Sequence, residues 1–298
     1  IFGRHSINDQ IIADIHHAYD EFMDYVKDLR LIPGVDLRKM FRMPAYKRFN
    51  TQLEKMRTLF RSLLKEARTR GRTNELDMLT LLIEAQQADP ANFTDEDILN
   101  QCFTVIFAGF ESTSIVMQWM WKVLDERPDV RNKIRAEIAH HIPDINHFSY
   151  QDLSKLDYLA AFFHESTRLY PPFWITGRQP LSDDMLGDYP IKKDTLIVLP
   201  HFAMHRHPRY WKEPNAFMPE RFLPLDSVEY DAGIFFPFSH GPRKCSGYKL
   251  AEMEAKIIFA KLISAFDVII HNGAMNGFDG VVSLKPKYPL MGEVKSLR

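Results

Sequence analysis

The stretch "FFPFSHGPRKCSGYKLAEME", residues 235–254, carries Cys245, one of only two cysteines in this chain of 298 residues. Cys245 lies between Gly241 and Gly247, it follows Arg243 by two positions, and a helical pattern begins directly after it. Glycines permit backbone conformations and close approaches that a Cβ atom forbids. The N-terminus of a helix directs unpaired N–H groups toward the sulfur. This setting favours a thiolate.

A cysteine prepared in this way can serve as a nucleophile, a redox sensor or a metal ligand. His240 is close in sequence, but nothing else resembles a cysteine hydrolase. A zinc site needs three or four ligands at short spacings, and the second cysteine, Cys102, is far away. The flanking Phe238 and glycines argue against a purely structural cysteine. The pattern therefore favours an axial thiolate ligand of a haem iron, with the macrocycle supplying the other four ligands.

Composition sets broad limits on function. A net charge of −1 gives no electrostatic reason to expect a nucleic-acid partner. Two distant cysteines form no disulfide framework, which indicates a reducing compartment. No apolar run reaches the ~18 residues of a membrane span. The chain begins "IFGRHS", without methionine, so we expect a longer natural polypeptide. It would be cytoplasmic, or held at the cytosolic face of a membrane by an anchor in the missing N-terminal region.

The first 170 residues have mainly helical patterns. Apolar spacing predicts helices in "INDQIIADIHHAYDEFMDYVKDL", from Tyr46 to Arg70, and in "ELDMLTLLIEAQQA". A long helix is predicted from Thr94 to just before Pro128, and its ~33 residues would form a rod of about 50 Å. Its middle is apolar on nearly every side, so we expect it to be buried, with Cys102 as a core residue. Two more helices follow, the second ending in "AAFFHESTRLYPP".

The residue composition changes after residue 170. From Pro171 to about Pro200 the residues are β-branched and aromatic, with turn signals at "LGDYP" and "IKKD", which predicts short strands. A proline-rich loop leads into the cysteine stretch, an amphipathic helix follows, and the tail returns to strand-like pieces. The predicted fold class is mainly α with a minor, segregated β region.

Four motifs together indicate a family. The spacing F-x-x-G-x-R-x-C-x-G, residues 238–247, resembles the haem-binding signature of the cytochrome P450 superfamily. "AGFEST" at 108–113, "HESTR" at 164–168 and "MPERF" at 218–222 precede it in the family's order. The resemblance implies a single P450-like domain over 1–298. Residues 1–170 would form its helical part, and 171–298 the β region, the meander, the cysteine loop and the following helix. It covers the C-terminal two thirds of a typical member, so the N-terminal part is expected to be absent from this chain.

The resemblance assigns a structural triad. Glu165 and Arg168 are three residues apart on a helix, and are therefore neighbours on one face. An exposed pair at this spacing contributes ~0.3 kcal/mol. By similarity to the family, however, the two join Arg221 in a buried triad that fixes the meander ahead of the cysteine loop.

"AGFEST" is where the resemblance places the reaction. Gly109 would leave room for dioxygen, and an acid–alcohol pair, Glu111 and Ser112, would relay protons, with Thr113 next to it. Serine stands where threonine is usual, and it lacks the methyl group that stiffens χ1, so we expect proton delivery to be less well controlled. Ala108 stands where members that esterify their haem carry a glutamate. The haem is therefore expected to be non-covalent, apart from the thiolate–iron bond.

The expected cofactor is haem b, iron protoporphyrin IX, with Cys245 as the axial ligand of the iron. Arg243 and Arg178 resemble the arginines that bind the propionates, for which a guanidinium has suitable geometry. Phe238 would tune the donor strength of the sulfur, and Gly247 would let the loop approach the porphyrin. Substrate contacts are expected from Phe107, Phe110, Phe173, Trp174, Ile175 and Thr176. A separate metal site at His201, His205 and His207 is not expected, because the family's loop commonly carries a histidine there.

The implied function is that of a haem-thiolate monooxygenase. It would insert one oxygen atom from O2 into a C–H bond of a small apolar substrate of fatty acid, terpenoid or xenobiotic type. The chain holds no flavin, nucleotide or iron–sulfur motif, so electrons would come from a separate NADPH-dependent reductase or ferredoxin, docking near Arg243, Lys244 and Lys249. A peroxygenase or hydroperoxide isomerase, and a non-catalytic truncated fragment, remain as alternatives.

Overall fold

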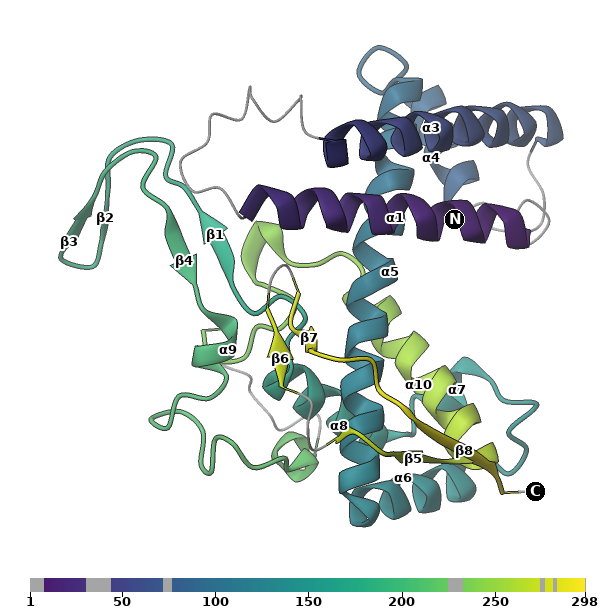
Figure 1. The fold of residues 1–298 in the computed structure, drawn as a ribbon, viewed down its shortest axis with the longest axis vertical. Coiled ribbons are helices and arrows are strands. Elements are labelled where there is room, and N and C mark those ends of the chain that lie inside the picture. Colours follow the sequence, from purple (N-terminus) through teal and green to yellow (C-terminus); the bar gives the residue numbers. More distant parts are fainter. Residues whose placement is uncertain are drawn as a thin grey trace. The chain divides into compact units, whose positions relative to one another are not determined.

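The computed structural model describes residues 8–30, 44–71, 77–224, 233–273, 277–280 and 283–297. The chain forms two compact units, residues 1–108 and 109–298. Helix α5 (Asp95–Glu126) contributes to both of them. Each unit is therefore described by itself (Figure 1).

The first unit is helical in the residues that the structure describes. It contains α1 (Asp9–Arg30), α3 (Pro44–Arg70), α4 (Met78–Ala88) and the first part of α5. Its core is lined by small and large apolar side chains that include Ala18, Met56, Phe60, Leu64, Leu79, Ile98, Leu99 and Cys102. The prediction that Cys102 is a core residue is confirmed, and burial raises the pKa of its thiol to about 11.

The beginning of α5 is fixed by local hydrogen bonds and by ion pairs. The Thr94 N–H donates to the Asp97 carboxylate at 2.8 Å, and the Asp97 N–H donates back to Thr94 Oγ1 at 3.3 Å. Such reciprocal bonds satisfy N–H groups that lack partners within the helix. Arg68 binds Asp95 at 2.6 Å and, together with Gln86, lowers the pKa of that carboxyl to about 2. These contacts set the helix start where the sequence predicts it.

The core of the second unit combines the remainder of α5 with α6 (Pro128–His141), the short α7 (Tyr150–Leu153), α8 (Asp157–Leu169) and α10 (Tyr248–Ala265); the short α9 (His201–Met204) also belongs to this unit. The apolar faces of α5, α6, α7, α8 and α10 meet in one core that includes Val116, Met120, Leu124, Ile134, Leu159, Phe162, Phe163 and Phe259. Figure 1 shows α6, α8 and α10 gathered around the lower part of α5. Among the described residues, no helix is long and apolar enough to span a bilayer.

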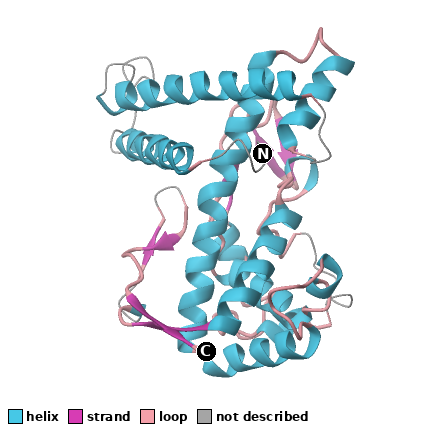
Figure 2. Cartoon of the chain, turned by 90° about the vertical axis from the view of Figure 1, so that its right-hand side faces the viewer, coloured by secondary structure: helices cyan, strands magenta, loops and turns pink. Residues whose placement is uncertain are grey.

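The strands that the structure describes are short and pair only in antiparallel twos (Figure 2). β1 (Thr176–Arg178) pairs with β4 (Ile197–Leu199), placing Thr176 opposite Leu199. The other pairs are β2 (Asp184–Leu186) with β3 (Tyr189–Ile191), β5 (Phe266–Ile270) with β8 (Gly292–Ser296), and β6 (Phe278–Asp279) with β7 (Lys285–Pro286). The predicted fold class, mainly α with a minor β region, is confirmed.

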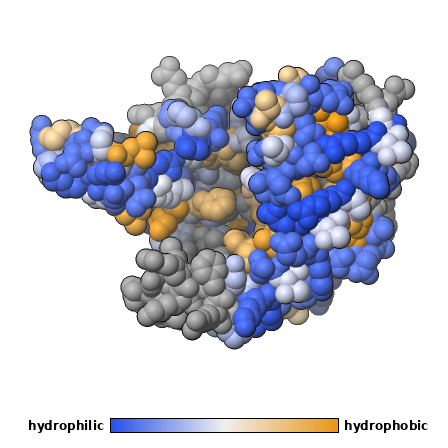
Figure 3. Space-filling model, turned by 90° about the horizontal axis from the view of Figure 1, so that it is seen from above, coloured by the Kyte–Doolittle hydropathy of each residue, from blue (hydrophilic) through white to orange (hydrophobic). Residues whose placement is uncertain are grey.

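The β2–β3 hairpin projects from the second unit, and its residues are largely solvated. It is the projection at the left of Figure 3, mostly hydrophilic with a few hydrophobic residues. Met185, Leu186 and Tyr189 are each more than half exposed. The predicted turn "LGDYP" is the turn of this hairpin, with Gly187 in the left-handed region at φ +59°. A glycine adopts that conformation without strain.

The middle of α5 differs from the prediction. The core of the first unit reaches along α5 only to Phe107, and the core of the second begins at Val116. Between them, Ala108 and Gly109 are exposed and residues 110–113 are half-buried. The prediction of a buried middle is therefore wrong. The reason is that apolar residues on several faces of a helix need packing partners on all those faces, and each core covers only one end.

Candidate functional site

Cys245 lies exposed at the end of a tightly turned loop. A single 3-10 turn over Gly241–Arg243 leads to it, and Gly241 adopts φ +67°, which favours glycine. The Cys245 N–H donates to the Phe238 carbonyl at 2.8 Å, so the loop closes on its own backbone. Helix α10 begins just after the cysteine, with Gly247 as its N-cap. A Cβ at Gly247 would lie 3.9 Å from Cys245 Sγ, which places this glycine against the sulfur.

Basic side chains surround the cysteine loop. Arg178, on β1, donates from Nη2 to Ser239 Oγ at 3.2 Å, and thus ties β1 to the loop. Arg243 and Lys244 are exposed in the turn before Cys245. Lys244 Nζ lies 4.0 Å from the centre of the Tyr248 ring at the start of α10, within range of a cation–π contact. The loop therefore presents a thiol amid cationic groups.

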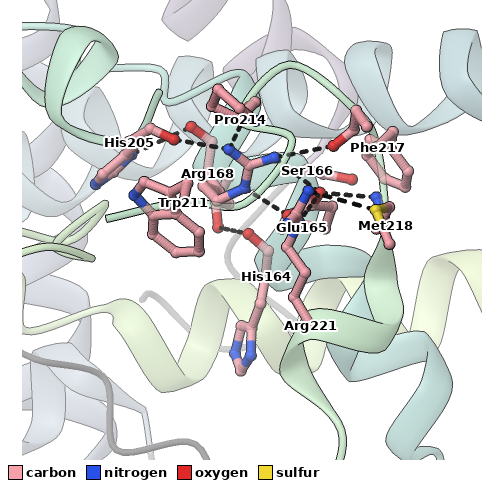
Figure 4. A network of polar contacts seen from close by, with 12 residues as sticks. His164, Glu165, Ser166, Arg168, His205, Trp211, Pro214, Phe217, Met218 and Arg221 are labelled. Carbon is pink, nitrogen blue, oxygen red and sulfur yellow. Dashed lines mark hydrogen bonds and ion pairs between the residues drawn. The ribbon is translucent and has the colours of Figure 1, made fainter. Parts of the chain in front are cut away.

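The end of α8 holds the most deeply buried charges that the structure describes. Glu165 and Arg168 have side chains that are 0% exposed, and they form a bidentate pair with Nε···Oε2 and Nη2···Oε1 distances of 2.6 and 2.8 Å (Figure 4). Bidentate geometry strengthens a charged hydrogen bond. Taking two charges out of water is costly unless every donor and acceptor is satisfied.

The remaining Arg168 donors find backbone carbonyls of the meander. Nη1 donates to His205 O at 2.7 Å and to Pro214 O at 2.8 Å, and Nη2 donates to Ala216 O at 3.1 Å. All five guanidinium N–H donors are therefore used. The Trp211 ring centre lies 4.8 Å from the guanidinium carbon. Arg168 thus holds three points of the meander to α8.

Arg221 joins this centre at its edge. Its Nε lies 3.4 Å from Glu165 Oε1, and its Nη2 donates to Glu213 O at 2.7 Å. The Met218 N–H also donates to Glu165 Oε1, at 2.7 Å. The structure therefore brings together the three residues that the resemblance assigns to a triad. Glu220, the residue directly before Arg221, does not join this cluster, and its carboxylate binds Lys133 on α6 at 2.6 Å.

Two histidines of "HFAMHRHP" were not recognised as part of the site from sequence. His205 and His201 are almost fully buried, and both hydrogen-bond the backbone of Phe236 in the segment that leads to Cys245. Their i, i+4 spacing in "HFAMHRHP" is the signal that could have shown them to act as a pair.

Glu137 on α6 is a further residue that sequence reasoning missed. Its carboxylate accepts the N–H groups of Tyr158 and Leu159, at 2.6 and 2.9 Å, at the start of α8. Those N–H groups have no partner within the helix. Burial raises the pKa of Glu137 despite these bonds. No local spacing indicates this contact, because its partners lie in another helix.

The acid–alcohol residues lie in the middle of α5, outside both cores. Glu111, Ser112 and Thr113 are half-buried, and Glu111 makes no ion pair with any residue that the structure describes. The Ser114 hydroxyl donates to the Glu111 carbonyl at 2.8 Å, so a hydroxyl already competes for the helical backbone here. A Cβ added at Gly109 would have no atom within 4 Å.

The residues expected to contact substrate lie in different surroundings. Phe173 and Ile175 are exposed, and Phe110 is half-buried. The Trp174 indole N–H is buried beside Gly280 without a partner among the described residues. Thr176 bonds His201. Phe107 packs with Tyr19, Phe22 and Phe103 in the first unit.

The fold is mostly helical, and it presents an exposed cysteine in a glycine-flanked, basic loop. The chain belongs to the cytochrome P450 family, whose model matches residues 1–290. It is 36% identical over 235 residues to a cytokinin hydroxylase of Arabidopsis thaliana, covering 76% of this chain and 45% of that protein. It is 31% identical to cytochrome P450 3A9 of Rattus norvegicus, covering 73% and 43%. The chain thus spans about half the length of these curated relatives.

Membership of this family implies a haem-iron cofactor. The residues present fit such a group. Cys245 is the exposed cysteine of the chain, and Gly247 keeps the space beside its sulfur free of a side chain. Arg178 and Arg243 offer two guanidinium groups at or next to the same loop, and guanidinium suits carboxylates such as propionates.

Proposed function

We propose that this chain is the haem-binding part of a P450-type monooxygenase, with Cys245 as the axial thiolate of a non-covalent haem b. The observation that supports this most directly is the loop from Phe238 to Gly247. It exposes Cys245, fixes the Cys245 backbone through its N–H bond to the Phe238 carbonyl, and leads directly into the N-terminus of α10. A helix N-terminus stabilises negative charge.

When bound, a haem with a thiolate ligand supplies the activation of O2 through which one oxygen atom enters a C–H bond and the other leaves as water. The chain's own residues hold and orient the group. Arg178 and Arg243 bind the propionates through charged hydrogen bonds. Phe238 packs against Phe163 of α8, with ring centres 6.2 Å apart, and this contact anchors the start of the cysteine loop to α8.

Glu111 and Ser112 are proposed to supply the protons. The Glu111 carboxyl takes a proton from water, which it reaches because this part of α5 is not fully buried. The Ser112 hydroxyl, which can both donate and accept, would take the proton from the Glu111 carboxyl and release one from its own Oγ. Gly109 leaves the adjoining face of the helix without a side chain.

The substrate is proposed to be a small apolar molecule of fatty acid, terpenoid or xenobiotic type. Phe110, Phe173, Ile175 and Trp174 are apolar or aromatic, and each is exposed or only half-buried. Contacts of this kind recognise apolar area and shape. The relatives include a hydroxylase, which is consistent with oxygen insertion.

A separate donor protein is proposed to deliver the electrons. Arg243, Lys244 and Lys249 are exposed around the cysteine loop and the first turn of α10. Such a cationic patch would steer an acidic partner and accelerate encounter at low salt. A reductase or a ferredoxin would dock within reach of Cys245.

The two cysteines provide the test. The reduced, CO-bound holoprotein is expected to show the absorption band of thiolate-ligated haem, and Cys245→Ser is expected to abolish it. Cys102→Ser is the matched control, because Cys102 is buried in the first unit; it should keep the band. A spectrum of histidine-ligated haem in the unchanged protein, or a band that survives Cys245→Ser, would overturn the proposal.

A further inference from the structure

Two buried histidines, one helical turn apart, face the same residue of the segment that leads to the cysteine loop. His201 begins the short helix α9 (His201–Met204), and His205 is its C-cap. The two side chains belong to residues that are 1% and 0% exposed. Their ring centres lie 4.5 and 5.3 Å from that of Phe236.

His205 connects α8 to this segment through both ring nitrogens. Nε2 lies 3.1 Å from the Phe236 N–H, and Nδ1 lies 3.2 Å from the Arg168 carbonyl. An N–H can only donate and a carbonyl can only accept, so the ring must be neutral with its proton on Nδ1. The pKa of His205 agrees, because burial lowers it to about 3.

His201 completes the hold on Phe236. Its Nδ1 donates to the Phe236 carbonyl at 3.0 Å, and its Nε2 faces the Thr176 hydroxyl at 3.0 Å. In the neutral ring Nε2 accepts from that hydroxyl. The N–H and the C=O of one residue are therefore each bound by a histidine, and neither bond belongs to a helix or a strand.

The bonds continue in both directions. Arg168 Nη1 donates to the His205 carbonyl at 2.7 Å, so His205 and Arg168 hold each other reciprocally (Figure 4). On the other side, the Ser239 N–H donates to the Phe236 carbonyl at 2.9 Å, and the Cys245 N–H donates to Phe238. These hydrogen bonds, joined through the peptide bond between Phe238 and Ser239, thus link the buried pair on α8 to the cysteine.

We infer that His201 and His205 are positioning residues that set the place of the cysteine loop and so the direction of Cys245 Sγ. A packing role alone would need only rings, which phenylalanine supplies. Here each ring nitrogen has a hydrogen-bond partner. His205 accepts from the Phe236 N–H and donates to the Arg168 carbonyl, and His201 donates to the Phe236 carbonyl. The inference rests on the function proposed above only in the test that uses the absorption spectrum of bound haem.

The test replaces the ring nitrogens and keeps the ring. In the holoprotein, His205→Phe should lower the ratio of thiolate-ligated to other haem in the reduced CO spectrum by about tenfold, the size expected from losing one to two hydrogen bonds. His207→Phe is the control, because His207 is exposed on the same segment and its ring accepts a hydrogen bond from the nearby Arg209 N–H rather than from Phe236. Circular dichroism confirms that each variant is folded.

Amide substitutions separate the two bonds. His205→Gln can place a carbonyl near the position of Nε2 and should recover part of the ratio, whereas His205→Asn reaches only the position of Nδ1 and should not. In the haem-free chain, hydrogen exchange of the Cys245 amide should be about tenfold faster with His205→Phe. This measurement carries the inference even if His205→Phe binds no haem.

The outcomes are distinct. Unchanged ratios and unchanged Cys245 exchange in His205→Phe would overturn the positioning role while leaving the proposed function intact. Absence of the thiolate band in the unchanged protein would overturn the proposed function instead, and the exchange measurement alone would then decide the positioning role.

Discussion

The end of α8 and the middle of α5 carry two motifs of the same family, but they lie in opposite environments. Glu165 and Arg168 are 0% exposed, and every guanidinium donor has a protein acceptor. Glu111 is half-buried and forms no ion pair with a described residue. Contacts within the polypeptide account for Glu165 and Arg168 of "HESTR", whereas among the described residues no ion pair accounts for Glu111 of "AGFEST". The first motif is therefore explained by folding, and for the second we propose a role in the chemistry.

The largest effect is expected at Arg168. Replacing it with alanine leaves Glu165 as a buried charge and releases three meander carbonyls, so the free energy of unfolding should fall by about 3–5 kcal/mol. Lys192→Ala is the control, because Lys192 pairs with Asp183 in an exposed ion pair on the β2–β3 hairpin. It should cost less than about 1 kcal/mol. Urea unfolding measures both; equal losses would contradict the comparison.

The pH dependence of stability should reveal His205. Its ordinary pKa is 6.5 and burial lowers it to about 3 in the folded chain, next to His201, Arg168 and Arg206. Between pH 6.5 and about 3, His205 therefore binds a proton in the unfolded chain but not in the folded chain. This contribution to stability is present above pH 6.5 and is lost as the pH falls toward 3, by at most about 1.4 kcal/mol per pH unit. The difference between the unchanged chain and His205→Phe isolates it; parallel profiles would exclude it.

Replacing glycine with alanine should change the free energy of unfolding in opposite directions at Gly109 and at Gly292. In the haem-free chain, Gly109→Ala should raise the free energy of unfolding by about 0.5–1 kcal/mol, because alanine favours a helix and its Cβ meets no atom within 4 Å. Gly292→Ala should instead destabilise the chain, because its Cβ would clash with the Ile269 carbonyl of β5. In the holoprotein, Gly109→Ala should lower product formation. Destabilisation by Gly109→Ala would show that packing requires this glycine.

The sequence predicted the helices well because their signals are local. Helix α5 begins and ends within two residues of its predicted limits, since Thr94 caps it and Pro128 cannot continue it. The β2–β3 turn was also predicted from a local signal, because it needs a residue with positive φ and Gly187 supplies it. Burial was not predicted as well, because periodicity shows which residues are apolar but not what packs against them. The exposed middle of α5 is the result.

The candidate site shows the same division. Its motif positions followed from a resemblance, and the spacing of Glu165 and Arg168 predicted that they share a helix face. The acceptors of Arg168 could not be predicted, because they are backbone carbonyls and any residue type can supply one. Glu137 and the start of α8 meet only after the helices pack. Contacts through backbone groups leave no pattern in the sequence.

The smallest effect on stability is expected at Ser112, and it is the one most directly tied to the reaction. Ser112→Ala should change the free energy of unfolding by less than about 0.5 kcal/mol, because the residue lies outside both cores. It should nevertheless raise the hydrogen peroxide released per NADPH consumed, since the hydroxyl that we propose delivers protons is lost. Ser114→Ala is the control, because that hydroxyl is engaged with the Glu111 carbonyl of its own helix. Equal coupling in both variants would remove Ser112 from the proton path and leave the open middle of α5 without its proposed chemical role.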